Sequence, residues 1–268
     1  MIFRGRIRIN TGTLWQGCRL AGWVALLGIT HVAWAQDRYD LGGGFLGAAA
    51  VETGYVHENN YFYETSNGIS ANGYSIKPTA DIARTSSTVG FKANAALDHT
   101  EFDFPGNLDT WTDYNAGGEL GWQAAERHNF NLSGTFRHGH DAAGLRRTEG
   151  VPDFSFGNLD QWDASSGFLS YRYGSPGALG GSTLRVGAMD RHYLTNRAAT
   201  VFLDYTTNYL DYELAYAYSP RTAVLLYAGQ IGTNYARPSL FGLGDRNGNE
   251  FDVRCLLYTS DAADEGLG

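Results

Sequence analysis

The chain has 268 residues and carries 20 Lys and Arg against 28 Asp and Glu, a net charge of −8, which argues against a nucleic-acid-binding surface. Two cysteines and six prolines exclude a disulfide-framework or collagen-like protein. The mean hydropathy of −0.30 excludes a helical membrane protein. It is compatible with a membrane β-barrel, because barrel strands alternate apolar and polar residues.

The first 35 residues have the pattern of a secretory signal peptide. A basic segment without acidic residues precedes the apolar run Leu20–Val32, and Ala33-Trp34-Ala35 matches an A-x-A cleavage site. The alternative, a retained membrane anchor, is disfavoured because the run is too short to span a bilayer and contains His31. We expect cleavage after Ala35 and export of the protein.

Residues 36–254 show one repeated pattern, an alternation of apolar and polar side chains with a period of two, which predicts β-strands. The best examples run for nine to eleven residues, whereas strands of soluble proteins are typically about five or six residues long and tilted membrane strands about 9–11. The predicted strands, in chain order, cover 48–57, 74–82, 89–98, 112–123, 130–137, 162–173, 183–189, 210–218, 223–231 and 249–254.

The links between these strands alternate between short and long, as in outer-membrane barrels with tight periplasmic turns and long outer loops. The alternative, a soluble β-sandwich, would show this strict alternation only by coincidence. The short links lie near 84–87, 124–128, 174–181 and 219–222. The long links lie near 58–73, 99–110, 139–160, 190–206 and 232–248.

The hairpin around Glu126 and its aromatic residues give further support to the prediction of a membrane barrel. A turn centred on Glu126 places Trp122 opposite Phe130 and Leu120 opposite Leu132, so apolar residues meet on one face. Trp122, Phe130 and Tyr218 all lie next to short links, where an interfacial aromatic girdle is expected. The alternative is that these rings form the core of a sandwich.

The polar positions of the same strands predict a barrel interior with balanced charge. Asp81 and Lys92 are expected to form an ion pair across the short link that joins their strands. Equal numbers of cations and anions give no strong ion preference, which suits a water-filled conduit or a polar interior filled by side chains. The predicted lumen-facing charged residues are Lys77, Asp81, Lys92, Glu119, Arg137, Arg185, Asp211 and Glu213.

The C-terminal residues 255–268 have a different character. Cys255-Leu-Leu-Tyr-Thr-Ser-Asp-Ala-Ala-Asp-Glu265 resembles the translated transposon-end adapter used to make sequencing libraries. We therefore expect 255–268 to be a non-native tail without a barrel strand, and the barrel in 36–254 to be incomplete at its C-terminus; a natural polar tail is the alternative. Residues 36–254 contain no cysteine, which suits an exported protein.

Four segments resemble a known family. They are His57-Glu-Asn-Asn-Tyr-Phe-Tyr63, Ile76-Lys-Pro-Thr79, Phe136-Arg-His-Gly-His-Asp141 and Tyr216-Ala-Tyr-Ser-Pro-Arg-Thr222. Together they resemble the β-barrel porins of the second type, bacterial outer-membrane proteins often linked to exopolysaccharide production. The resemblance implies an antiparallel transmembrane β-barrel in the bacterial outer membrane. It also implies contact with outer-membrane lipid and with polysaccharide or envelope export machinery. The terminal strands expected of such proteins are absent.

Candidate chemistry in the sequence is sparse. His138, His140 and Asp141 could approach a metal, but no further strong ligand is evident nearby, and the glycine of 244–250 is wrongly placed for an EF-hand. No G-x-S-x-G nucleophile motif occurs. We therefore predict no catalytic residue, no metal site, no cofactor and no enzymatic activity. The leading function is porin-like passage of solutes or support of surface-polysaccharide export; the alternatives are a scaffolding barrel that displays loops and an outer-membrane hydrolase.

Overall fold

The computed structural model describes residues 32–33, 38–59, 70–103, 110–141, 158–174, 178–219, 222–239 and 244–259. These residues form one antiparallel sheet, so the predicted all-β class is confirmed. Each of the ten predicted strands is present and longer than expected. The strands are β3 (Phe45–Glu58), β4 (Ala71–Thr85), β5 (Val89–Phe102), β6 (Thr110–Ala125), β7 (His128–His140), β8 (Gln161–Tyr173), β9 (Gly180–Tyr193), β10 (Tyr205–Ser219), β11 (Thr222–Tyr235) and β12 (Gly248–Thr259).

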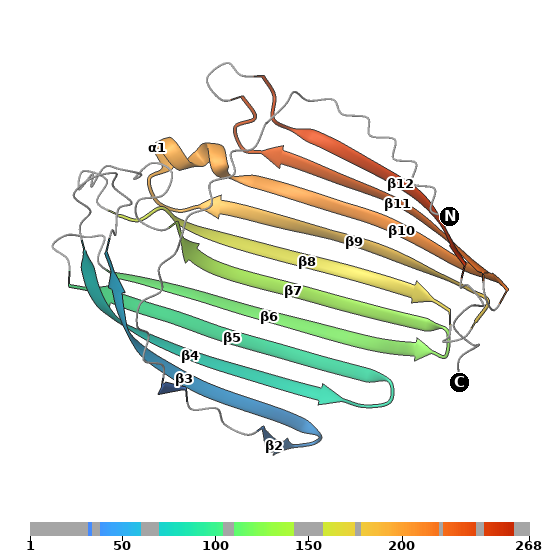
Figure 1. Cartoon of the computed structure of the whole chain (residues 1–268), viewed down its shortest axis with the longest axis horizontal. Coiled ribbons are helices and arrows are strands. Elements are labelled where there is room, and N and C mark those ends of the chain that lie inside the picture. Colours follow the sequence, from blue (N-terminus) through green and yellow to red (C-terminus); the bar gives the residue numbers. More distant parts are fainter. Residues whose placement is uncertain are drawn as a thin grey trace, which may run out of the picture.

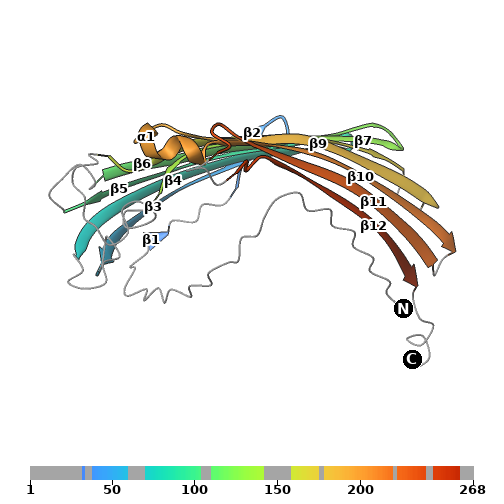
Figure 2. The same ribbon diagram turned by 90° about the horizontal axis from the view of Figure 1, so that it is seen from above.

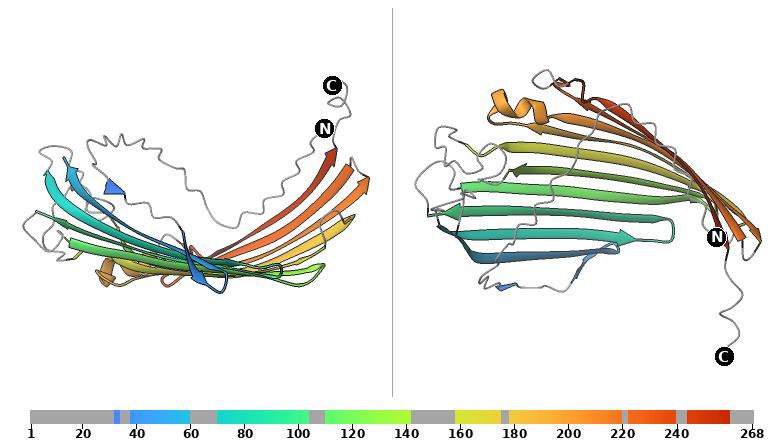
Figure 3. Two further views of the ribbon diagram at one scale, coloured as in Figure 1. Left: turned by 90° about the horizontal axis from the view of Figure 1, so that it is seen from below. Right: turned by 45° about the horizontal axis from the view of Figure 1, so that its top comes forward.

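Each of these strands pairs with the strand that follows it in the chain, so the sheet order is the chain order. The strand ends that short links join all lie at the right end of the sheet in Figure 1, and the strand ends that long links join lie at the left end, as the sequence predicts. Figures 2 and 3 show that the sheet is strongly curved and twisted. It is the curved wall of an antiparallel β-barrel, open between β3 and β12.

Smaller elements lie at the β3 edge and in one long link. The short strands β1 (Val32–Ala33) and β2 (Tyr39–Gly42) pair with β3. Among the described residues, β12 has a neighbouring strand only on one side, which is β11. The link between β9 and β10 contains α1 (Arg197–Thr200) and the 3-10 helix η3 (Val201–Leu203). Among the described residues, no helix has the length and apolar composition needed to cross a membrane.

The period-two alternation divides the sheet into an apolar and a polar face. The strand registers align the apolar side chains of neighbouring strands: Leu120 pairs with Leu132, and Leu132 pairs with Leu169. The row continues through Val186 to Leu210. These side chains are substantially exposed, Leu132 at 53%. A continuous exposed apolar surface is what a lipid-facing wall requires.

The predicted hairpin between β6 and β7 is confirmed. Trp122 pairs with Phe130, and Leu120 pairs with Leu132. The rings of Trp122 and Phe130 are stacked, with centroids 5.5 Å apart. A short turn after strict alternation determines this register, because a shift by one residue would move every apolar side chain to the other face.

The expectation that no barrel strand occurs in 255–268 is wrong for Cys255–Thr259. These residues extend β12 and pair with β11, for example Cys255 with Leu226. The physical reason is that β11 has backbone N–H and C=O groups available for pairing along its edge as far as Thr222. In addition, Leu257 continues the alternation of residues 249–254. Leu257 is nevertheless 57% exposed, so the extension adds no buried core.

Several predictions fall outside the described residues. Of the predicted signal peptide, the structure describes only the backbone of Val32–Ala33. The cleavage site after Ala35 and the end of the C-terminal tail, 260–268, also lie outside them. The signal peptide, its removal and the origin of the tail therefore stay predictions.

Candidate functional site

The candidate site is the polar face of the sheet. Residues paired across neighbouring strands have side chains on the same face, so the registers can be followed from strand to strand. Lys92 pairs with Glu119, and Arg185 pairs with Asp211. Followed across all strands, the registers put the eight predicted charged residues on one face, with their strands as follows: Lys77 and Asp81 on β4, Lys92 on β5, Glu119 on β6, Arg137 on β7, Arg185 on β9, and Asp211 and Glu213 on β10.

Of the eight, the structure brings three into contact. Arg185 Nη1 lies 3.1 Å from Asp211 Oδ1, and Arg185 Nη2 lies 3.9 Å from Glu213 Oε2. Glu119 accepts a hydrogen bond of 2.7 Å from the Asn131 side-chain amide on β7. The single cation between β9 and β10 therefore offsets one of the two anions near the middle of the face, and the cluster keeps a net charge of −1.

The expected ion pair between Asp81 and Lys92 is absent from the described residues. Asp81 pairs with Asn94 and Lys92 with Ala83, so the two charges are diagonal neighbours. The carboxylate of Asp81 instead lies 3.5 Å from Arg38 Nη2, which precedes β2. The contact with Arg38 was not predictable from the hairpin, because it depends on how the chain before β3 folds back onto the sheet.

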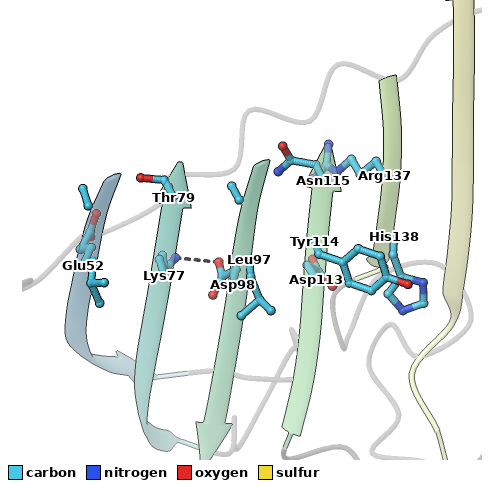
Figure 4. Close-up of a pocket in the computed structure, with 13 residues that line it drawn as sticks. Glu52, Lys77, Thr79, Leu97, Asp98, Asp113, Tyr114, Asn115, Arg137 and His138 are labelled. Carbon is cyan, nitrogen blue, oxygen red and sulfur yellow. Dashed lines mark ion pairs between the residues drawn. The ribbon is translucent and has the colours of Figure 1, made fainter. Parts of the chain in front are cut away.

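A pocket of about 480 Å3 opens over β3 to β7 near the long-link end of the sheet (Figure 4). Within it, Lys77 Nζ lies 2.8 Å from Asp98 Oδ2, and Asn115 and Arg137 pair across β6 and β7. The sequence prediction missed Asp98 and Asp113 as site residues, although the alternation already put both on the polar side of their strands. The lining combines the charged and polar residues Glu52, Lys77, Asp98, Asp113, Asn115 and Arg137 with the apolar residues Ala50, Val51, Ala96 and Leu97.

The two histidines considered as metal ligands turn to different partners. His138 Nδ1 lies 2.7 Å from Asp163 Oδ1 on β8, whereas His140 Nδ1 lies 2.8 Å from Asp113 Oδ1 on β6. Within the described ranges, no group of three or more His, Cys, Asp or Glu side chains could hold a metal ion. The two imidazoles therefore act as separate hydrogen-bonding groups near the end of β7.

The predicted aromatic girdle residues lie at the short-link end of the apolar face. The Phe130 ring also contacts Tyr171, at 5.0 Å between centroids, and Tyr218 near the end of β10 is 78% exposed. A second aromatic group, which the sequence prediction missed, lies at the long-link end, where the Tyr114 ring stacks on His138 at 4.8 Å. Tyr114 and Trp122 are eight residues apart on β6, about 27 Å along a strand, and tilt reduces this toward the ~25 Å apolar band of membrane barrels.

No protein-family model matches the sequence. A search of curated proteins also finds no match. Among solved structures, the chain is similar to the outer membrane channel DcaP of Acinetobacter baumannii, with 11% identity and a TM-score of 0.45 over 84% of this chain and 67% of that one. It is also similar to the NanC porin, with 14% identity and a TM-score of 0.34 over 81% of this chain and 98% of that one. Similarities this distant say nothing about the solute or the mechanism.

Proposed function

We propose that this chain forms the wall of a bacterial outer-membrane β-barrel through which polar solutes pass. The observation that carries the proposal is that the strand registers put the eight predicted charged residues, which lie on six of the ten long strands, on one face, and the row of aliphatic side chains from Leu120 to Leu210 on the other. The apolar face suits lipid, and the charged face suits a wet lumen lined by the eight residues named above. The girdle residues Trp122, Phe130 and Tyr218 would then lie at the membrane interface.

Two further parts of the proposal concern the ends of the chain. Residues 1–35 would direct export and be removed after Ala35. Since 255–265 resembles an adapter, the natural sequence would replace 255–268 with the strands that join β12 to β3. Experiments on function therefore require the protein expressed from the complete gene, in which the eight lumen residues are unchanged.

The face assignment is tested by adjacent cysteines. Leu132 and Ser133 are neighbours on β7 whose side chains lie on the apolar and the polar face, respectively. In a protein without other cysteines, a membrane-impermeant, water-soluble thiol reagent should modify Ser133→Cys rapidly in reconstituted vesicles. Leu132→Cys should react slowly because lipid shields it. Equal reactivity of the two, or the reverse order, would remove the basis for the membrane wall.

The passage of solutes is tested by ion conductance. The complete protein, inserted into planar lipid bilayers, should produce discrete conductance steps, and the heat-denatured protein should produce none. A protein that inserts and protects Leu132→Cys, but produces no steps, would instead be a scaffolding barrel that displays its long links.

On the family resemblance alone, we further propose that the passage serves surface-polysaccharide export. Deletion of the gene should then lower the amount of polysaccharide on the cell surface, and the complete gene should restore it. Unchanged surface polysaccharide in the deletion strain would contradict the export role. It would not contradict the proposal of general solute passage.

A further inference from the structure

Arg137 differs from three other arginines on the polar face. Arg185 is paired with Asp211, and the Arg191 and Arg254 guanidiniums contact Asp141 and Asp252. The Arg137 side chain is exposed and, within the described residues, has neither an ion pair nor a hydrogen bond. Its positive charge is therefore available to a solute.

The Arg137 guanidinium is held in place by an aromatic ring rather than by an acid. Its Cζ lies 5.3 Å from the centroid of Trp162, a residue on β8 that is 8% exposed. Trp162 pairs with Gly139, and a Cβ at Gly139 would lie 2.8 Å from indole Cζ2. Glycine thus allows the indole to lie over β7, where a cation–π contact restrains Arg137.

A second guanidinium approaches the same place from the opposite side. Ala164 on β8 pairs with Arg137 on β7 and with Arg191 on β9, so a small side chain separates the two arginines. Arg191 Cζ lies 4.0 Å from the Trp162 ring centroid. Trp162 Nε1 and Arg191 Nε are both buried without a hydrogen-bond partner in the part of the chain that the structure describes. The cluster therefore has an excess of hydrogen-bond donors over acceptors.

The acids around Arg137 are engaged elsewhere. Asp113, one residue pair away on β6, lies 2.8 Å from His140 Nδ1, and Asp98 lies 2.8 Å from Lys77 Nζ. Asp163, whose backbone pairs with His138, bonds that histidine on the apolar face. None of them supplies the acceptor that the donors lack.

We propose that Arg137, supported by Trp162 and Arg191, binds an oxyanion group of a passing solute, a carboxylate or a phosphate. The planar guanidinium matches both groups geometrically, and the restrained side chain loses little freedom on binding. The inference rests on the proposed function, because it assumes that the polar face lines the passage. Arg137 and Trp162 lie toward the long-link end of β7 and β8, so they would contact a solute early if it enters from that side.

The test uses the complete protein in planar bilayers and three matched probes: glucose, glucuronate and glucose 6-phosphate. Each probe is titrated while the ion current is recorded. Glucuronate, glucose 6-phosphate or both should reduce the current at lower concentration than glucose. Arg137→Gln should raise the half-blocking concentration of the active anion about tenfold or more, because it removes a charge-assisted bidentate contact. Trp162→Phe, which keeps a ring but removes the N–H, should raise it less.

Arg172→Gln is the matched control. Arg172 lies on β8 on the same face, is exposed, and pairs with Asn129 at the short-link end, away from Trp162. This substitution should leave the half-blocking concentration unchanged. Equal effects of Arg137→Gln and Arg172→Gln, or equal block by glucose and the anions, would overturn the inference. Either result would still be compatible with the proposed function as a channel. The absence of any current from the wild-type protein would overturn the proposed function as well.

Discussion

The hairpin of β6 and β7 and the link between β9 and β10 show two ways of stabilising this chain. In the hairpin, a repeated pattern of side chains leaves most residues in contact with the surroundings on one face or the other; Trp122, for example, is 51% exposed. In the link, Thr200 at the end of α1 and Asp204 directly after η3 are almost fully buried. The stability of the hairpin depends on the alternation of side chains between the two faces, and the stability of the link depends on individual contacts.

Asp204 is the centre of the second region. Its carboxylate accepts the Tyr193 backbone N–H at 2.8 Å and contacts Arg197 at 2.7 Å and His192 Nδ1 at 2.9 Å. Thr200 donates its hydroxyl to the Thr195 carbonyl at 2.7 Å. One acidic side chain thus joins the end of β9 to the helical turn, and its loss cannot be compensated by water in a buried position. Substitutions should therefore be costly at particular points of the link, but in the hairpin only when they break the face pattern.

The largest effect is expected at Asp204. Asp204→Ala should lower the free energy of unfolding by about 3–5 kcal/mol, because it leaves a buried N–H and the Arg197 charge without their partner. Asp204→Asn keeps an acceptor for the Tyr193 N–H and should cost less. Urea unfolding in phospholipid vesicles measures both. Asp245→Ala, in the exposed link between β11 and β12, is the control and should change stability by less than about 0.5 kcal/mol. A similar loss in Asp204→Ala and the control would contradict the importance of the network.

The face pattern of the hairpin is broken by Leu132→Arg. Leu132 lies on the apolar face, two residues from the girdle residue Phe130, so an arginine there should cost up to about 2–4 kcal/mol, which is the cost at the bilayer midplane. Ser133→Arg puts the same side chain on the polar face one residue later and should leave stability nearly unchanged. The two variants are compared by the same urea unfolding. If both lose equal stability, the two faces do not meet different solvents.

The smallest effect is expected for the aromatic pair at the short turn. Single and double alanine substitutions of Trp122 and Phe130 form a double-mutant cycle. Because the rings stack at 5.5 Å between centroids, the coupling energy should be about 0.5–1.5 kcal/mol. A cycle between Trp122 and Tyr218, which lies on β10, serves as the control and should show no coupling. Coupling of similar size in both cycles would indicate a general effect of interfacial aromatics rather than a paired contact.

The alternation of apolar and polar residues is enough to predict the strands of the wall and the faces of their side chains. Alternation with a period of two is a local property, and a strand with one apolar and one polar face can pair only in registers that keep each face in its own solvent. In a hairpin, the length of the short turn then selects one of these registers. For this reason the ten strands, the pairing of Trp122 with Phe130, and the common face of Lys92 and Glu119 could all be predicted. The lengths of the strands were underestimated because pairing with a neighbour extends a strand beyond the residues from which it was predicted, as at Cys255 in β12.

Which individual side chains meet depends on how the strands and the segments before them are placed relative to one another. Asp81 contacts Arg38 instead of Lys92, and Asp113 contacts His140, although neither partner follows from the alternation. The cluster of Arg137, Trp162 and Arg191 comes from three strands, and its members approach one another only through the registers of β7, β8 and β9. A periodic pattern determines the face to which a side chain points. The length and path of the links determine how far the neighbouring strand is shifted along its axis, and that shift selects the contacts.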